Sequence, residues 1–294
     1  EKNEHSFPAS EAEASRRLDH FLNGANRPVN DYNRLSGMLA NEPTSKLSPY
    51  LRFGLISPKK AVAEAVRALN HTDHDSLRTA IMAWVREISF RDFYISEPSR
   101  HSLKRSDVPG GDSIIWDNNQ VSFEAWKSGL TGYPVVDAGM RQLKATGWIP
   151  NRARLIVASF LTKHLLIDWK TGAEWFMQTL IDGDASINRG NWKWVASIGA
   201  GSSPPFRILN PIRQSRRFDP DGSYIRRWVP ELSLVPNDLI HNPWSMDSSE
   251  LKRYKLSLGT NYPAPIVEHE EAIRRANLAY RRVDTSIGTG KVVQ

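Results

Sequence analysis

The sequence predicts an all-α fold, and two observations support that prediction. Apolar residues recur at three- and four-residue spacing through most of the chain, while alternating strand patterns are scarce. Serine, proline and glycine stand where these segments begin and end, as they do at helix termini. We therefore expect one multi-helical domain over 1–294, with "YIRRWV" (224–229) as a weak candidate for a strand.

The first predicted helices carry clear start signals. Ser10 would cap a helix over 10–23, with Glu13 three residues later as in a capping box. Ser57 would cap a helix over 57–70 that has proline in its first turn. The apolar face expected on this second helix comprises Val62, Ala65, Val66 and Leu69.

Four further helical regions follow along the chain. Helical periodicity runs over 76–95, and 134–147 opens with proline and closes with glycine. Residues 153–172 are apolar over a wide arc, which predicts one central buried helix, followed by another segment over 173–182. The last predicted helix, 268–283, precedes a polar tail.

The composition excludes several classes of protein. No apolar run approaches the ~20 residues that span a bilayer, and the polar, acidic start is not expected to be a secretory leader. Cysteine is absent, which excludes disulfides, thiol catalysis and cysteine-ligated zinc or iron–sulfur sites, and no metal site is predicted. We expect a monomeric, cytoplasmic protein.

The net charge of +7 suits a polyanionic partner such as nucleic acid, although a merely basic enzyme would give the same value. Six arginines in 206–228 interleave with Phe218, Tyr224 and Trp228, a pattern typical of nucleic-acid contact. The alternative is a solvated surface. These arginines are Arg207, Arg213, Arg216, Arg217, Arg226 and Arg227.

Small hydroxyl side chains gather at the start of a predicted helix. Thr44, Ser45 and Ser48 lie in "NEPTSKLSPYLRFG", where the helix would begin near Ser48. Hydroxyls and free amides at a helix start form an anion site. An ordinary helix cap is the alternative reading of the same residues.

Trp84, Glu87 and Arg91 are spaced three and four residues apart, so they share one stripe of a helix. A Glu–Arg pair at this spacing is usually a solvated surface bridge. The tryptophan on the same stripe favours a ligand pocket instead.

Three polar residues open the most apolar helix. Asn151, Arg152 and Arg154 would lie at its N-terminus, where cations oppose the helix dipole. Such a placement requires partners, which would be carboxylates, phosphates or a ligand. Asp182 and Asp184 are the candidate carboxylates.

Trp192 and Trp194 flank a single lysine. If 187–197 is helical, residues two apart diverge by about 200° around the axis, so the two rings cannot serve one surface. One would face inward and the other a cavity or a partner. Two core fillers are the alternative.

These stretches together resemble the helical flavin domain of the photolyase/cryptochrome family, and most closely the class I cyclobutane pyrimidine dimer photolyases. The resemblance runs in order from about Tyr32 to His269. The motifs that carry it are "TSKLSPYLRFGLISP", "WVREISFRDFY", "GYPVVDAGMRQLKATGWIPNRARLIVASFL", "LLIDWKTGAEWFMQTLIDGD", "NRGNWKWVAS", "RILNPIRQSRRFDPDGSYIRRWVPEL" and "YPAPIVEH".

The resemblance implies an FAD-binding domain that splits cyclobutane pyrimidine dimers in UV-damaged DNA. The dimer is flipped into a pocket, and light drives electron transfer from reduced FAD. The family's N-terminal α/β antenna domain has no counterpart in the chain, so no antenna chromophore is expected to bind this segment. The FAD contacts that the resemblance implies are Tyr32, Thr44, Ser45, Ser48, Trp84, Arg91, Asn151, Arg154, Asp182, Asp184 and Asn188.

The resemblance also implies specific roles. Arg154 would pair with Asp182, and Asn188 would face flavin N5, where an amide favours the reduced form. The implied catalytic residues are Glu87, Asn188 and an electron wire of Trp192, Trp169 and Trp116, inner to outer. The implied contacts to the dimer or DNA are Glu87, Phe90, Asn151, Arg152, Trp194, Arg207, Arg213, Arg216, Arg217 and Arg226.

Subfamily differences narrow the expected activity. The (6-4) photolyases carry a histidine pair where this chain has Asn151 and Arg152, and plant-type cryptochromes tend to have aspartate at position 188. Phe90 departs from the class I pattern, which has a pocket tryptophan there. Two alternatives remain: a cryptochrome-like photoreceptor that binds FAD without repair, and a helical DNA-binding domain without a cofactor.

Overall fold

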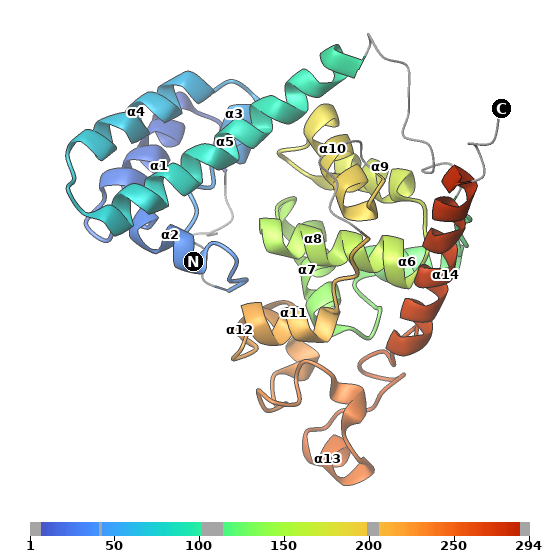
Figure 1. Ribbon diagram of the computed structural model, residues 1–294. Helices are drawn as coiled ribbons and strands as arrows, with labels where there is room; N and C mark the ends of the chain where they lie inside the picture. Colours follow the sequence, from blue (N-terminus) through green and yellow to red (C-terminus); the bar gives the residue numbers. More distant parts are fainter. Residues whose placement is uncertain (1–6, 41–42, 102–113, 199–205, 289–294) are drawn as a thin grey trace, which may run out of the picture.

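A computed structural model describes residues 7–40, 43–101, 114–198 and 206–288, and Figure 1 shows their arrangement. Within these ranges the fold is all-α, as predicted, and an isolated bridge between Leu258 and Tyr262 is the sole β-type pairing. None of the helices in these ranges is long and apolar enough to cross a membrane.

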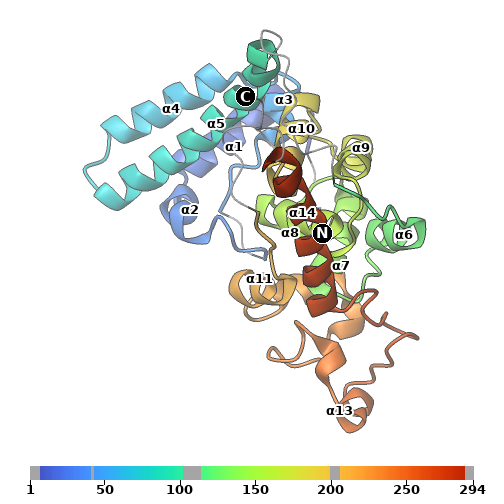
Figure 2. The ribbon, with the colours of Figure 1, turned by 45° about the vertical axis from the view of Figure 1, so that its right-hand side comes forward.

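The described residues form two lobes, which Figure 1 and Figure 2 show side by side. The N-terminal lobe, 7–101, is built around one buried cluster that runs from Ala14 to Ile88. Its helices are α1 (Glu11–Asn23), α2 (Val29–Leu35), α3 (Ser48–Arg52), α4 (Pro58–Asn70) and α5 (Asp75–His101).

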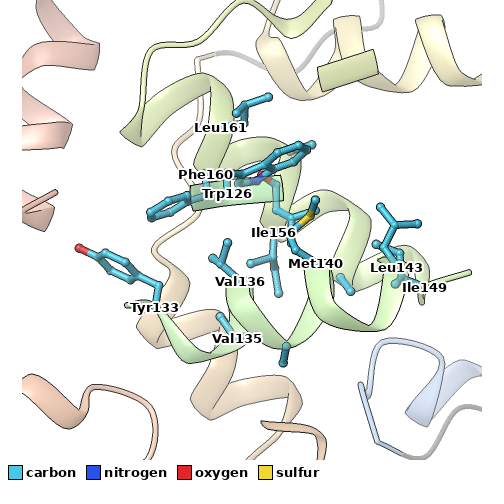
Figure 3. Packing of buried hydrophobic residues seen from close by; sticks show 14 of the residues in the cluster. Trp126, Tyr133, Val135, Val136, Met140, Leu143, Ile149, Ile156, Phe160 and Leu161 are labelled. Atoms are coloured by element: carbon cyan, nitrogen blue, oxygen red, sulfur yellow. The ribbon is translucent and has the colours of Figure 1, made fainter. Parts of the chain in front are cut away.

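The C-terminal lobe, 114–288, surrounds a larger buried cluster. Figure 3 shows how Val136 and Met140 of α7 and Ile156 of α8 gather there with Trp126 and Phe160. Its α-helices are α6 (Gln120–Ser128), α7 (Pro134–Thr146), α8 (Asn151–Ser159), α9 (Trp169–Thr179), α10 (Ala185–Ala196), α11 (Pro211–Phe218), α12 (Ser223–Trp228), α13 (Ser248–Arg253) and α14 (His269–Gly288). Its short turns are the π-helical η2 (Phe160–His164) and the 3₁₀ turns η3 (Pro230–Leu232) and η4 (Pro243–Ser245).

The predicted serine caps are confirmed at both early helices, but the Glu13 carboxylate accepts hydrogen bonds from Arg16 and Arg17 instead of completing a capping box. Ser10 Oγ accepts a hydrogen bond from Glu13 N at 3.1 Å, and Ser57 Oγ accepts one from Lys60 N at 3.1 Å. The buried face of α4 is centred on Ala61 and Ala65, whereas Val66 is exposed, so the predicted face is partly wrong.

The prediction of one helix over 153–172 is wrong. The α8 helix ends at Ser159, η2 follows, and the chain turns at Leu166, which has a φ of 50°. The α9 helix then begins after Asp168, whose side chain accepts a bond from Lys170 N at 3.0 Å. An aspartate can cap a new helix even within an apolar run, and the left-handed Leu166 separates this helix from the one before it.

Three other predicted boundaries change. The expected strand over 224–229 is wrong: residues 224–228 belong to α12, because the buried Asp219 carboxylate accepts bonds from the backbone of Tyr224 and Ile225. The segment expected over 173–182 is the second part of α9 and ends at Thr179. The last helix continues to Gly288, five residues beyond its predicted end, and the rest of the polar tail lies outside the described residues.

Candidate active site

A cavity of about 640 Å³ lies between the two lobes. One wall comes from α2, the segment 44–52 and α5, and the other from 148–158, the loop 180–184 and α10. Residues that are far apart in sequence therefore meet here. The predicted site residues that line the cavity are Tyr32, Thr44, Ser45, Ser48, Trp84, Glu87, Phe90, Arg91, Asn151, Arg152, Arg154, Asp182, Asp184, Asn188, Trp192 and Trp194.

The N-terminal wall is held by hydrogen bonds from α5 to the segment 44–52. The Trp84 indole Nε1 donates to Ser45 Oγ at 3.2 Å, and the Trp84 side chain is buried. Arg91 donates to the carbonyl of Leu51 at 3.2 Å. The stripe predicted on this helix therefore faces the cavity, which supports the pocket reading over a solvated bridge.

Glu87 is the carboxylate on this wall. Its side chain is exposed toward the cavity, yet the walls exclude enough water that desolvation raises the pKa of the Glu87 carboxyl, with the charge of Arg86 opposing the shift. A raised pKa favours the protonated acid, which can donate a hydrogen bond as well as accept one.

The opposite wall contains an ion pair that the resemblance implied. Arg154 donates from Nη2 to Asp182 Oδ2 at 2.8 Å and from Nε to the carbonyl of Ile149 at 3.0 Å. The Asp182 side chain is only 3% exposed, so the pair is largely removed from water on the carboxylate side. A pair of this kind fixes the position of both groups.

Two residues of α10 are held in fixed orientations. Asp184 caps the helix, because its Oδ1 accepts bonds from Ser186 N at 3.0 Å and Ile187 N at 3.2 Å. The Asn188 side chain donates from Nδ2 to the carbonyl of Ala173 at 2.8 Å. A carbonyl can only accept, so the amide nitrogen must face α9, and the amide oxygen is left as the acceptor for a ligand.

Polar atoms on both walls suit an anionic cofactor. In the ranges that the structure describes, the buried atoms Thr44 Oγ1, Arg152 Nε and Asp182 Oδ1 have no hydrogen-bond partner. Buried polar atoms are normally paired, so these three point to a ligand with both donors and acceptors. The lining carries five cationic side chains against three carboxylates, an excess that fits a diphosphate.

The tryptophan pair has two environments, although both rings reach the cavity. Trp192 is 2% exposed and packs against Phe176 and Trp126, with ring centroids 5.0 and 6.4 Å away. Trp194 is only partly buried. The prediction that the two rings would serve wholly separate surfaces is thus half right: one belongs to the core, but each contributes to the cavity wall.

Trp169 and Trp116 lie away from the cavity. Trp169 is a member of the same buried cluster as Trp192, and Trp116 packs against that cluster. Trp192 also packs on Gly172, one turn along α9 from Trp169. The electron wire stays a prediction that this placement is compatible with.

The arginines of the segment 206–228, which were predicted to contact DNA, divide into two groups. The exposed side chains of Arg207, Arg213, Arg216 and Arg217 suit a phosphate backbone. The guanidinium of Arg217 lies 5.1 Å from the centre of the Phe218 ring, and Arg152 lies 4.2 Å from the same ring. Desolvation lowers the pKa of Arg152, and the charges of Arg217 and Arg207 lower it further.

Arg226 differs from the other arginines. It donates to the carbonyl of Val235 at 2.6 Å, to Asn237 Oδ1 at 2.9 Å, and to the carbonyl of Asp221. Its donors therefore hold the loops before and after α12, which weakens the prediction that it contacts DNA.

Several residues that line the cavity were not predicted from the sequence. Arg52 and Trp148 stand inside the quoted motifs, so their position there was the available signal. Tyr94 lies against Gly190 of α10, where an added Cβ would come within 2.2 Å of the ring. The missed lining residues with polar or aromatic side chains are Ser36, Lys46, Arg52, Tyr94, Trp148, Phe176 and Asn191.

Comparison with known proteins gives one consistent result. Residues 84–282 match the family model described as the FAD binding domain of DNA photolyase. A deoxyribodipyrimidine photo-lyase of Alkalihalophilus pseudofirmus is 44% identical over 253 residues, covering 83% of this chain and 51% of the relative. The chain spans about half the length of the curated relatives it matches.

Two solved structures extend the comparison. A class III photolyase from Agrobacterium tumefaciens superposes with a TM-score of 0.85 at 41% identity, covering 94% of this chain and 56% of its own. A Synechocystis cryptochrome superposes with a TM-score of 0.84 at 37% identity, covering 93% and 56%.

Proposed function

The chain belongs to the family of FAD-binding domains of DNA photolyases, and on that premise we propose that it performs the light-driven repair of cyclobutane pyrimidine dimers. The observation that carries the proposal is the cavity itself. Unpartnered polar atoms suited to a cofactor share it with Glu87, Phe90 and Trp194, which suit a damaged base. A single space for cofactor and lesion is what direct electron transfer requires.

FAD, when bound and fully reduced, would supply an electron to the dimer after absorbing light. The hydroxyls of Thr44, Ser45 and Ser48 would hold its phosphate side, and the cations of the lining would balance the charge of the phosphates. Asp182 lines the cavity and has one buried oxygen without a partner, which would accept from a flavin or ribityl donor.

Asn188 would set the redox preference of the site. Its amide oxygen is the free acceptor, because Ala173 holds the amide nitrogen. An acceptor at this place favours a flavin edge that carries a proton over one that does not. Such an acceptor would stabilise the reduced form of the cofactor, in which this edge of the flavin carries a proton.

Glu87 would serve the lesion. Desolvation raises the pKa of its carboxyl, and a dimer entering the cavity would remove more water from it. The protonated acid would donate a hydrogen bond to a base carbonyl, where negative charge develops during splitting. Phe90 and Trp194 would provide apolar faces on which the extruded bases stack.

DNA would lie on the exposed arginines Arg207, Arg213, Arg216 and Arg217. Contacts to phosphates carry no sequence information, which suits an enzyme that recognises damage rather than sequence. Binding should weaken steeply with salt, since each phosphate contact releases counterions.

A cryptochrome-like photoreceptor is the second candidate, favoured by the Synechocystis cryptochrome whose fold this chain shares. The fold is common to a class III photolyase as well, so the substrate proposal rests on the pocket residues rather than on class. Glu87, Asn188 and Trp194 support repair over signalling.

The test is repair of an oligonucleotide with one thymine dimer, under blue light, with FAD fully reduced. Restored thymines in light and none in darkness are expected. Flavin that photoreduces without any repair would support the photoreceptor instead, and a purified protein that binds no flavin would remove both proposals.

A further inference from the structure

One side chain of the N-terminal lobe crosses the seam between the lobes at the edge of the cavity. Arg52, the last residue of α3, donates from Nε to the carbonyl of Gly183 at 2.6 Å, and its guanidinium lies 3.9 Å from Asp184 Oδ2. Gly183 follows Asp182 in the loop before α10. The Arg52 side chain lines the cavity, yet 40% of it is exposed to solvent.

A second side chain crosses the same seam in the opposite direction. Trp148 of the C-terminal lobe is 5% exposed, and its indole Nε1 donates to Ser48 Oγ at 3.3 Å. Its ring also lies 6.0 Å from the ring of Phe7. Lys46 Nζ lies 5.5 Å from the centre of the Trp148 ring. The segment 44–52 is therefore attached to the C-terminal lobe through the buried Trp148 and through the exposed Arg52.

Both points of attachment lie on neighbouring loops of the C-terminal lobe that are bonded to each other. Ile181 N donates to the carbonyl of Gly147 at 2.9 Å. Gly147 has a φ of 68°, and a Cβ there would lie 2.7 Å from Ile181 Cγ2. The loops 147–150 and 180–184 are thus tied to each other, so the segment 44–52 is the part that can separate from them.

We propose that Arg52 is a releasable latch, whose bond to Gly183 must open for FAD to enter or leave the cavity. The inference rests on the proposed function, because it takes FAD as the ligand. Candidate cofactor residues stand on both walls, so a bound FAD would contact both lobes, and the contacts between the lobes at the edge of the cavity would control its passage. The exposed contact of Arg52 yields more easily than the buried contact of Trp148.

A direct bond from Arg52 to the cofactor would have different kinetics. A cation that only binds the diphosphate attracts the anion, so its removal slows association or leaves it unchanged while dissociation speeds up. A latch obstructs both directions, so its removal speeds up both. Arg52 is then a positioning residue that acts through the segment 44–52.

The experiment measures FAD association and dissociation by flavin fluorescence, with flavin-free protein and with loaded protein. Arg52→Ala should raise both rate constants by about tenfold, the effect of losing one charge-assisted hydrogen bond. Arg52→Gln should be intermediate, since its amide can still donate to Gly183. The control is Arg67→Ala, an exposed arginine of α4 that pairs with Glu64 on its own helix at 2.7 Å.

A second measurement needs no cofactor. The chain has no cysteine, so a single thiol can be placed at Ala158, which lines the cavity and is 4% exposed. Labelling of Ala158→Cys should be faster when Arg52 is also alanine. Equal labelling rates, or faster dissociation without faster association, would overturn the latch. Protein that binds no FAD at all would count against the proposed function, and the labelling rates would still decide the latch.

Discussion

The two walls of the cavity differ in how firmly they are held. The C-terminal wall is fixed from within its own lobe: Asn188 is bonded to Ala173, Arg154 to Asp182, and Trp192 packs on Gly172. The N-terminal wall includes the five-residue helix α3, which is too short to be stable alone. We infer that the C-terminal wall, which would tune the chemistry of the cofactor, is rigid, whereas the N-terminal wall, which would bind the phosphate side of the cofactor, can adjust.

Gly172→Ala should break the rigid wall and have the largest effect. An added Cβ would lie 2.3 Å from Trp192 Cη2 and 2.4 Å from Leu161 Cδ2, so Trp192 or α10 must shift. We expect a loss of about 3 kcal/mol in the free energy of unfolding, as for overpacked cores. Urea unfolding measures it, with Glu174→Ala on the exposed side of α9 as control. A neutral substitution would show that this wall can move.

Asn188→Asp should change chemistry more than binding. The substitution sets a carboxylate oxygen against the Ala173 carbonyl at the place of a 2.8 Å hydrogen bond, a loss of about 2 kcal/mol. Photoreduction and repair should fall by at least tenfold at saturating FAD, measured by flavin absorption and by dimer repair. Asn191→Asp is the matched control, since that amide bonds the carbonyl of Ile187 in its own helix. Equal losses in both variants would contradict a special role for position 188.

Trp84→Phe should affect the adjustable wall alone. The variant keeps an aromatic ring but loses the indole bond to Ser45, worth about 1 kcal/mol. FAD should bind about fivefold more weakly, by fluorescence titration, while the photoreduction rate of the saturated protein stays as in the parent. A slower photoreduction would mean that both walls tune the cofactor.

Glu87→Gln should give the smallest effect on the free energy of unfolding, and the effect should be visible in how that free energy depends on pH. The raised pKa means that the folded protein holds this proton more tightly than the unfolded chain does. The contribution of Glu87 to stability is therefore full below the unfolded pKa of about 4.3 and is lost as pH rises through the folded value. The variant should remove this dependence, which we expect to be under about 0.5 kcal/mol because solvent screens the side chain. Urea midpoints from pH 4 to 8 would reveal it.

Local features of the fold were readable from the sequence, whereas long-range contacts were not. The caps Ser10 and Ser57 act within three residues, so their motifs predict them directly. The break before Asp168 was not predicted, because this single capping residue stands within a long apolar segment whose pattern predicts one helix. The bonds of Arg52 and Trp148 span 131 and 100 residues of sequence, and no local pattern marks such partners.

The site residues came from the resemblance rather than from spacing alone. Periodicity placed Trp84, Glu87 and Arg91 on one stripe, but it left a surface bridge open as an alternative. The arginine-rich region shows the limit of composition. Composition alone groups Arg226 with the DNA contacts, although its side chain donates hydrogen bonds to Asp221, Val235 and Asn237.

The contact of Tyr94 with Gly190 has an evolutionary consequence. It brings α5 against α10, so the width of the cavity depends on one missing methyl group. A lineage that replaced Gly190 with alanine would have to push the two helices apart or exchange Tyr94 for a smaller residue. The two positions should therefore be inherited as a pair, and a paired change there offers selection a way to reshape the pocket without altering any residue that performs chemistry.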